Sequence, residues 1–204
     1  MAELTVTTFV SVDGVMQAPG GPKEDTSGGF RYGGWVFPHA DKDMGAIIVE
    51  NFSKVDAFLL GRGTYDIFAA HWPKYTDPND PIASKLNTLP KHVASRTREN
   101  FEWGNSSGVR DVAAEVASLK KRYQGELQVH GSAGLLQTLI RQDLVDEYRI
   151  FTFPVLLGTG KRLFGSSAAP GALTLKASKT SGAGVIYSVY RRSGPVKTGS
   201  FAAE

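Results

Sequence analysis

The stretch Ala57–Phe68 constrains the fold of this chain more than any other, because it reads as a strand, a tight turn and a helix start in immediate succession. Its apolar run fits a buried strand that ends in Gly61-Arg62-Gly63-Thr64, and helical spacing of apolar residues begins directly afterwards. A helix N-terminus presents unpaired N–H groups and partial positive charge, and Arg62 and Thr64 add donors, so the turn is a candidate phosphate site. A plain Gly-rich connection with a solvated arginine explains the same residues equally well.

Length and charge favour a single domain with a small-molecule ligand. The 204 residues fit one domain, and their hydrophobic share of 41% suffices for a core. The net charge of +3 is spread over 23 basic and 20 acidic residues, which is too diffuse for a nucleic-acid surface. We therefore expect no nucleic-acid partner, whereas a mildly basic surface suits a small anionic ligand.

Cysteine is absent, which excludes disulfides, thiolate metal sites and a cysteine nucleophile. The four histidines are scattered without a pair at ligand spacing, so no metal site is expected. No run approaches the roughly 18 apolar residues of a membrane span, and the N-terminus lacks the pattern of a secretory signal. We expect a cytoplasmic protein without a membrane partner.

Residues 11–40 form the longest irregular region and are the expected lid of a binding site. The region contains seven glycines and three prolines, interleaved with aromatic residues. A loop of this length inside a compact domain is usually functional or disordered, and disordered segments are poor in aromatic residues. The aromatic residues that favour an ordered lid are Phe30, Tyr32, Trp35 and Phe37.

Strands and helices alternate along most of the remaining chain. The patterns predict strands at 4–10, 57–60, 91–95, 127–130, 148–154, 172–180 and 185–191, and helices at 41–54, from 64, 83–89, 111–122 and from 133. The last two strands follow each other without a helix between them. This order predicts an α/β fold with a mostly parallel sheet and an antiparallel C-terminal edge. Residues 193–204 are expected to form a flexible tail.

Three of the expected strand ends carry residues that suit phosphate groups. They are Gly61-Arg62-Gly63-Thr64, Ser95-Arg96-Thr97 and Gly131-Ser132-Ala133-Gly134. Ligands of open α/β sheets bind outside the carboxyl ends of the strands, so the three ends could converge on one polyphosphate ligand. The alternative is that the glycines serve close helix packing and that the arginines are solvated.

Ser132 is not the expected nucleophile of a hydrolase. The succession of a strand, HGSAG and a helix is similar to a nucleophile elbow, but His130 stands where the first glycine belongs. The base histidine of that fold follows the serine, whereas His130 is the last histidine of this chain. A phosphate-binding P-loop fails as well, because Val155 stands five residues before Gly160-Lys161 in place of a glycine. His130 is interpreted as a polar residue with its hydrogen bonds satisfied.

Four motifs carry a resemblance to a known family. They are SVDGVMQ, LLGRGTYDIF, KHVASRT and, most specifically, VHGSAGLLQTLIRQDLVDEYRIFTFPVLLGTGKRLF. Together they resemble the dihydrofolate reductase superfamily, in particular the branch related to the reductase domain of bacterial riboflavin biosynthesis. The resemblance implies one reductase domain over residues 1–192, with a mixed, mostly parallel eight-stranded sheet flanked by helices, which binds NADPH across the strand ends.

The resemblance also implies which residues bind NADPH. The turn at 61–64 matches the family's turn at the cofactor phosphates, and 95–96 matches its pair near the adenosine 2′-phosphate, which a guanidinium can bind bidentately. The Gly-rich turn matches the family's pyrophosphate turn, and 14–17 lie where the family's mobile loop covers the nicotinamide. The implied residues are Gly14, Val15, Met16, Gln17, Gly61, Arg62, Thr64, Ser95, Arg96, Gly131, Ser132, Ala133, Gly134 and Leu135.

Asp41 is the implied catalytic carboxylate, and Asp13 is the second candidate. Dihydrofolate reductases place a carboxylate at the start of the helix after the lid, where this chain has Phe37-Pro38-His39-Ala40-Asp41. A carboxylate in a closed apolar cleft would have a raised pKa, which suits a proton donor. The alternative is that Asp41 only caps the helix. Trp35, Phe37 and Asp41 are the expected substrate contacts, although the lid aromatics could equally pin the loop to the body.

Folate is not the expected substrate, because the arginine that folate reductases carry ahead of the third motif is replaced here by Leu89-Pro90-Lys91-His92-Val93. The deaminase module of the riboflavin pathway would need zinc-binding cysteines, which this chain lacks. We expect an NADPH-dependent homodimer that reduces a C=N or C=O bond of a small pterin- or pyrimidine-like molecule. The alternative is a dimeric NADP(H)-binding sensor without catalysis.

Overall fold

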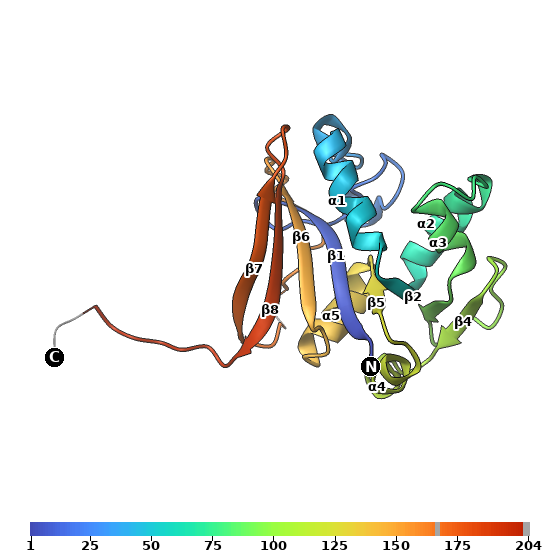
Figure 1. Cartoon of the computed structure of the whole chain (residues 1–204). Coiled ribbons are helices and arrows are strands. Elements are labelled where there is room, and N and C mark those ends of the chain that lie inside the picture. Colours follow the sequence, from blue (N-terminus) through green and yellow to red (C-terminus); the bar gives the residue numbers. More distant parts are fainter. Residues whose placement is uncertain (166–167, 202–204) are drawn as a thin grey trace.

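One eight-stranded sheet forms the centre of the computed structural model, which describes residues 1–165 and 168–201 (Figure 1). The strand order is β4-β3-β2-β5-β1-β6-β8-β7. The pairs from β4 to β6 are parallel, whereas β8 pairs antiparallel with both β6 and β7. The expected mixed sheet is thus confirmed. The strands are β1 Glu3–Ser11, β2 Val55–Gly61, β3 Lys91–Ala94, β4 Ser106–Val109, β5 Glu126–Val129, β6 Glu147–Phe153, β7 Ala172–Thr180 and β8 Ile186–Gly194.

Helices cover both faces of the sheet. Side chains of α4 and α5 pack in one core with the odd-numbered positions of β2 and β5, whereas α1, α2 and α3 pack on the opposite face. The helices are α1 Lys42–Phe52, α2 Arg62–His71, α3 Ala83–Thr88, α4 Val112–Arg122 and α5 Ala133–Arg141, and the short 3-10 helices are Ser27–Gly29, Phe37–His39 and Trp72–Lys74. None of the helices in the described ranges is long and apolar enough to cross a membrane.

Buried charges occupy the middle of the sheet face that α1 covers. Leu127 of β5 points into the core under α4 and α5, so Glu126 beside it points to the other face. There Arg149 of β6 donates to Glu126 over 2.6 and 2.9 Å and to Glu147 over 2.7 Å. Buried charges persist only when they are paired and hydrogen-bonded, and this arrangement meets that condition. The sequence patterns did not predict this polar layer.

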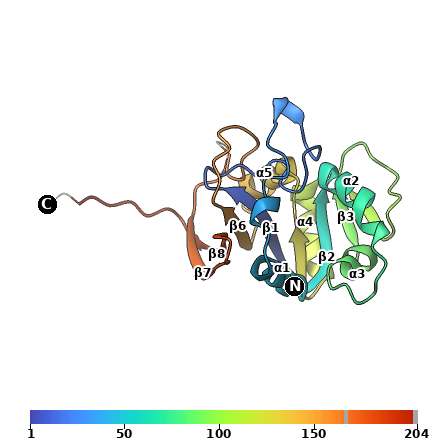
Figure 2. The same cartoon turned by 90° about the horizontal axis from the view of Figure 1, so that it is seen from above.

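The lid over residues 11–40 is irregular, as predicted, apart from two short 3-10 helices, and lies beside α2 (Figure 2). Aromatic packing attaches it to the body. The Trp35 ring meets the Phe153 ring edge to face at 5.3 Å between centroids, and its Nε1 donates to the Gln17 carbonyl over 2.8 Å. Phe30 and Val36 are buried in the same core. The lid is therefore a packed part of the domain.

The largest differences from the sequence prediction are one missed strand and the end of another strand. The strand β4 was not predicted, because its Ser106-Ser107-Gly108 segment is polar and lies at the edge of the sheet, where packing places little demand on the side chains. The strand β8 ends at Gly194, not at residue 191, because Gly194 still pairs with Ala172. Beyond it the described chain extends away from the body (Figure 1).

Candidate active site

The turns that follow β2 and β5 meet at the carboxyl edge of the sheet. The Gly61 N–H donates to the Gly131 carbonyl over 2.9 Å. A Cβ on Gly61 would lie 2.2 Å from Ser132 Oγ, and one on Gly131 would lie 2.8 Å from Thr64 Oγ1. Both positions favour glycine, because a Cβ on Gly61 would also lie 2.6 Å from the Ser132 backbone nitrogen, and Gly131 has a φ of +135°. Two of the three expected strand ends therefore come together.

The helices that follow these turns begin without a side-chain cap. Asp41 accepts from the Met44 N–H at the start of α1, and Asp111 accepts from the Ala114 N–H at the start of α4. In the described structure, no side chain accepts a comparable bond at Gly61 or Ser132, the N-cap residues of α2 and α5. Two adjacent helix N-termini without side-chain caps are suited to an anion, because the first N–H groups of a helix have no partner within it.

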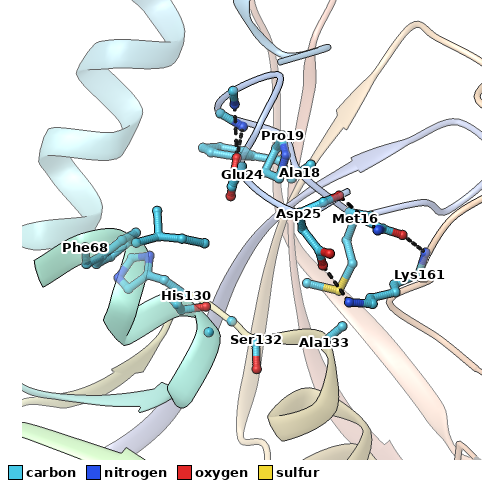
Figure 3. Close-up of a pocket in the computed structure, with 18 of the residues that line it drawn as sticks. Met16, Ala18, Pro19, Glu24, Asp25, Phe68, His130, Ser132, Ala133 and Lys161 are labelled. Carbon is cyan, nitrogen blue, oxygen red and sulfur yellow. Dashed lines mark hydrogen bonds and ion pairs between the residues drawn. The ribbon is translucent and has the colours of Figure 1, made fainter. Parts of the chain in front are cut away.

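A cavity of about 1090 Å³ opens beside the two turns (Figure 3). It lies between the lid, one face of α2, the C-terminal half of β1 and the turn after β5. Ligand pockets commonly measure about 300–1,000 Å³, so this cavity can hold a dinucleotide end together with a small ring. Its lining includes Thr7, Thr8 and Phe9 of β1, residues 16–25 and 27 of the lid, residues 63, 64, 66–68, 71 and 72, residues 130–133, and Lys161.

Aromatic side chains form one wall of the cavity. Phe68 and Trp72 are four residues apart, so they lie on the same side at the end of α2. The His130 ring lies 6.3 Å from the Phe68 ring between centroids, and its Nε2 lies 3.2 Å from Gln128 Oε1 (Figure 3). Burial lowers the pKa of His130 to about 4, so this imidazole is neutral at pH 7.

An ion pair and a hydrogen bond to the side-chain amide of Gln17 connect the lid to the loop after β6. Lys161 Nζ donates to Asp25 over 2.5 Å, and the Lys161 N–H donates to Gln17 Oε1 over 3.0 Å. Gln17 in turn donates to the Asp25 carbonyl over 3.1 Å. Although burial acts to raise it, the bond from Lys161 holds the pKa of Asp25 below its ordinary value. Asp25 is therefore held as an anion in the ion pair between the lid and the loop after β6.

Glu24 lies next to this ion pair and faces the cavity. Its Oε2 accepts from the Gly20 N–H over 2.5 Å and from the Gly21 N–H over 3.1 Å. Burial raises the pKa of Glu24 above its ordinary value, and the two N–H bonds offset only part of that rise.

The cavity contains only some of the residues that the resemblance implied. Of the expected cofactor residues, the lining includes Met16, Gln17, Thr64, Gly131, Ser132 and Ala133. Gly61 contacts Ser132 and does not itself belong to the described lining. Seven other expected residues do not belong to the described lining. They are Gly14, Val15, Arg62, Ser95, Arg96, Gly134 and Leu135. Val15 and Leu135 belong to the hydrophobic cores, whereas Arg62 and Arg96 are exposed.

The two expected proton donors do not line the described cavity. Both Asp41 oxygens are occupied, since one caps α1 at Met44 and the other accepts from the Ala183 N–H over 2.8 Å. These bonds hold the pKa of Asp41 below its ordinary value. Asp13 accepts from the Ser11 hydroxyl and from two N–H groups of the loop after β6, and its pKa is lowered to about 2. The expectation of a raised pKa was wrong for both.

The expected substrate contacts Trp35 and Phe37 also lie elsewhere. Trp35 is buried in the core that attaches the lid, and Phe37 is 83% exposed. Neither belongs to the described lining of the cavity.

Several residues that line the cavity were not predicted from the sequence, in particular Glu24, Lys161, Phe68 and Trp72. Helical spacing could have placed Phe68 and Trp72 on one side of α2, but not shown whether that side meets a core or a cavity. No local signal marks Glu24 or Lys161, because both lie in irregular segments without periodicity.

Comparisons with known proteins place the chain among relatives. The family model described as RibD C-terminal domain matches residues 2–187. The uncharacterized protein YyaP of Bacillus subtilis (strain 168) is 31% identical over 157 residues, which cover 76% of this chain and 82% of YyaP.

Solved structures share the fold. A provisionally named riboflavin biosynthesis protein of Shewanella sp. PV-4 superposes with a TM-score of 0.71 at 24% identity, covering 95% of this chain and 99% of that one. Dihydrofolate reductase of Enterococcus faecalis, solved with NADP(H), superposes with a TM-score of 0.55 at 13% identity, covering 93% and 96% of the two chains.

Proposed function

Because this chain belongs to the RibD C-terminal domain family, a family of reductases with a dihydrofolate-reductase-like fold, we propose that it is an NADPH-dependent reductase. Its substrate is a small pterin- or pyrimidine-like heterocycle with a reducible C=N or C=O bond. The observation that carries the proposal is the pair of uncapped helix N-termini that meet at the edge of a large cavity.

The residues at this edge fit the phosphates of a dinucleotide. Gly61 and Gly131 let the two turns touch, and the N–H groups that begin α2 and α5 are available to phosphate oxygens. Thr64 and Ser132 line the same cavity, and their hydroxyls lie where the two turns meet. When NADPH is bound, it supplies the hydride.

The remaining walls of the cavity suit a planar ring. Phe68 and Trp72 offer aromatic faces, and neutral His130 extends this wall without adding charge. The lid, clamped through Asp25 and Lys161, covers the cavity and keeps water from the reacting atoms. These residues orient the substrate and exclude solvent, which is a large part of what such a reduction needs from a protein.

Cofactor binding is the first test. Titration with NADPH and NADH, followed by protein fluorescence, should give micromolar or tighter affinity for NADPH. Lack of NADPH binding in that range would contradict both the reductase and the sensor.

Turnover is the second test. Oxidation of NADPH is followed by absorbance against a panel that includes dihydrofolate and 5-amino-6-(5-phosphoribosylamino)uracil. Reduction of a panel member supports the reductase, whereas tight NADPH binding without any turnover favours the non-catalytic sensor.

A further inference from the structure

We propose that Glu24, a residue of the lid, donates the proton to the substrate as it is reduced. The inference rests on the proposed reductase function and names the one part of the reaction that the expected residues Asp13 and Asp41 leave open. Three observations support it. They are the direction of the Glu24 carboxyl, the ion-pair partners of the other carboxylates in the cavity, and the charges around Glu24.

The Glu24 carboxyl is held at one oxygen and open at the other. Oε2 accepts from the N–H groups of Gly20 and Gly21, which orients the group. Within the described chain, no protein donor reaches Oε1, and Glu24 lines the cavity. Figure 3 shows the side chain entering the cavity from the lid, across from Phe68 and His130. A substrate ring against the aromatic wall would therefore present its polar edge to Oε1.

The other carboxylates of the described lining are already paired. Asp25 binds Lys161 Nζ over 2.5 Å. Asp66, at the exposed side of α2, binds Arg98. A carboxylate in an ion pair holds its charge and is a poor proton donor. Among the carboxyl groups of the described lining, Glu24 is thus the one that has an oxygen without a protein donor and that forms no ion pair.

The charges facing Glu24 do not favour its ionised form. From the lid, Asp25 is a neighbouring negative charge, and Lys23 is exposed. Across the cavity, α2 contributes Asp66 and His71, the neutral His130 follows β5, and Lys161 is paired with Asp25. Burial is the main cause of the raised pKa of Glu24, and the charge of Asp25 adds to it. More of Glu24 therefore stays protonated near neutral pH than of an exposed glutamate.

In the reduction, Glu24 gives its proton to the nitrogen or oxygen of the substrate while the adjacent carbon accepts the hydride that NADPH supplies. The π bond of C=N or C=O breaks, a C–H bond and an N–H or O–H bond form, and NADP⁺ remains. The Glu24 carboxylate then recovers a proton from water.

Glu24→Gln is the informative variant, because the amide oxygen can still accept from Gly20 and Gly21 while the acidic proton is lost. On a panel substrate that the wild type reduces, kcat at pH 7 should fall about 100-fold or more, whereas the Kd for NADPH should change by less than about twofold. Glu50→Gln, at an exposed glutamate of α1, is the matched control and should change neither value. A Glu24→Gln enzyme that keeps more than about a tenth of the wild-type kcat would overturn the proposal.

A second measurement needs no turnover. Protein labelled with ¹³C at glutamate carboxyls is titrated by NMR, and the resonance missing from Glu24→Gln identifies Glu24. Its midpoint should lie above the ordinary value of about 4.3; a midpoint at or below that value would overturn the proposal. If Glu24 titrates high but the wild type reduces no panel member, the failure belongs to the reductase proposal and not to the protonated state of Glu24.

Discussion

Replacement of Gly61 by alanine tests the contact between the two turns that the site depends on. Gly61 has a φ of −69° and a ψ of 151°, which alanine adopts without strain. Any loss in the free energy of unfolding therefore comes from steric crowding alone. The new Cβ would lie 2.2 Å from Ser132 Oγ, 2.6 Å from the Ser132 backbone nitrogen and 3.0 Å from Ser132 Cβ. A side chain could rotate away, but the backbone nitrogen cannot, so the turns must separate.

The expected loss follows from two contributions. Overpacking a tight site costs about 1–3 kcal/mol. Separation of the turns also weakens the bond from the Gly61 N–H to the Gly131 carbonyl, and a typical hydrogen bond contributes about 0.5–1.5 kcal/mol. The free energy of unfolding of Gly61→Ala should therefore fall by about 2–4 kcal/mol, a shift of the urea midpoint by roughly 1 M or more.

Binding should weaken along with stability. Because the N–H groups of α2 and α5 would no longer converge, the Kd for NADPH should rise about tenfold or more, which corresponds to about 1.4 kcal/mol. Urea unfolding followed by tryptophan fluorescence and NADPH titration of the folded variant measure the two effects separately.

Gly45→Ala is the matched control for Gly61→Ala. Gly45 lies inside α1, and a Cβ there would meet no atom within 4 Å. Alanine should raise stability there by about 0.5–1 kcal/mol, because it is the better helix former, and leave NADPH binding unchanged. If Gly61→Ala unfolds at the wild-type urea concentration and binds NADPH equally well, the turns do not depend on their close contact and the reasoning fails.

Three further substitutions test the assignments of single residues. Asp41→Ala removes the N-cap of α1 and should lower the free energy of unfolding by about 0.5–2 kcal/mol in urea, with NADPH affinity unchanged; a loss of affinity would return Asp41 to the site. The pKa of Asp13 is depressed to about 2, so its stabilisation is present above its unfolded pKa of about 3.9 and is lost as pH falls towards 2. Thermal melts of the wild type and Asp13→Asn should therefore differ at neutral pH and converge near pH 2, and a pH-independent difference would contradict the assignment. Arg96→Ala should weaken NADPH binding more than NADH binding if Arg96 meets the 2′-phosphate, and equal losses would refute that role.

Local patterns in the sequence were sufficient for most of the fold. The strand, turn and helix around Gly61 were predicted correctly because apolar runs, glycine turns and helical spacing are short-range signals. The same holds for α4, whose predicted start at Asp111 is confirmed by the bond from the Ala114 N–H. Strand β4 was not predicted, because a polar edge strand carries no such pattern.

The candidate site was only partly predictable. The turns at 61–64 and 131–134 were found because a glycine turn before a helix is visible in the sequence, and the resemblance implied the cofactor. The carboxylate was assigned to Asp41, since an aspartate at a helix start suits a cap and a catalytic acid alike. Its bonds to the Met44 and Ala183 N–H groups show that it is the cap.

The sequence by itself thus determined most of the strands, the helices and the two glycine turns, all of which depend on residues close together in the chain. Only the tertiary structure decided that Glu24, and not Asp13 or Asp41, faces the cavity. The path of the lid is set by contacts far apart in sequence, such as Trp35 with Phe153 and Asp25 with Lys161. An irregular segment has no periodicity that tells which side chain points inward, so long-range packing alone determines that direction.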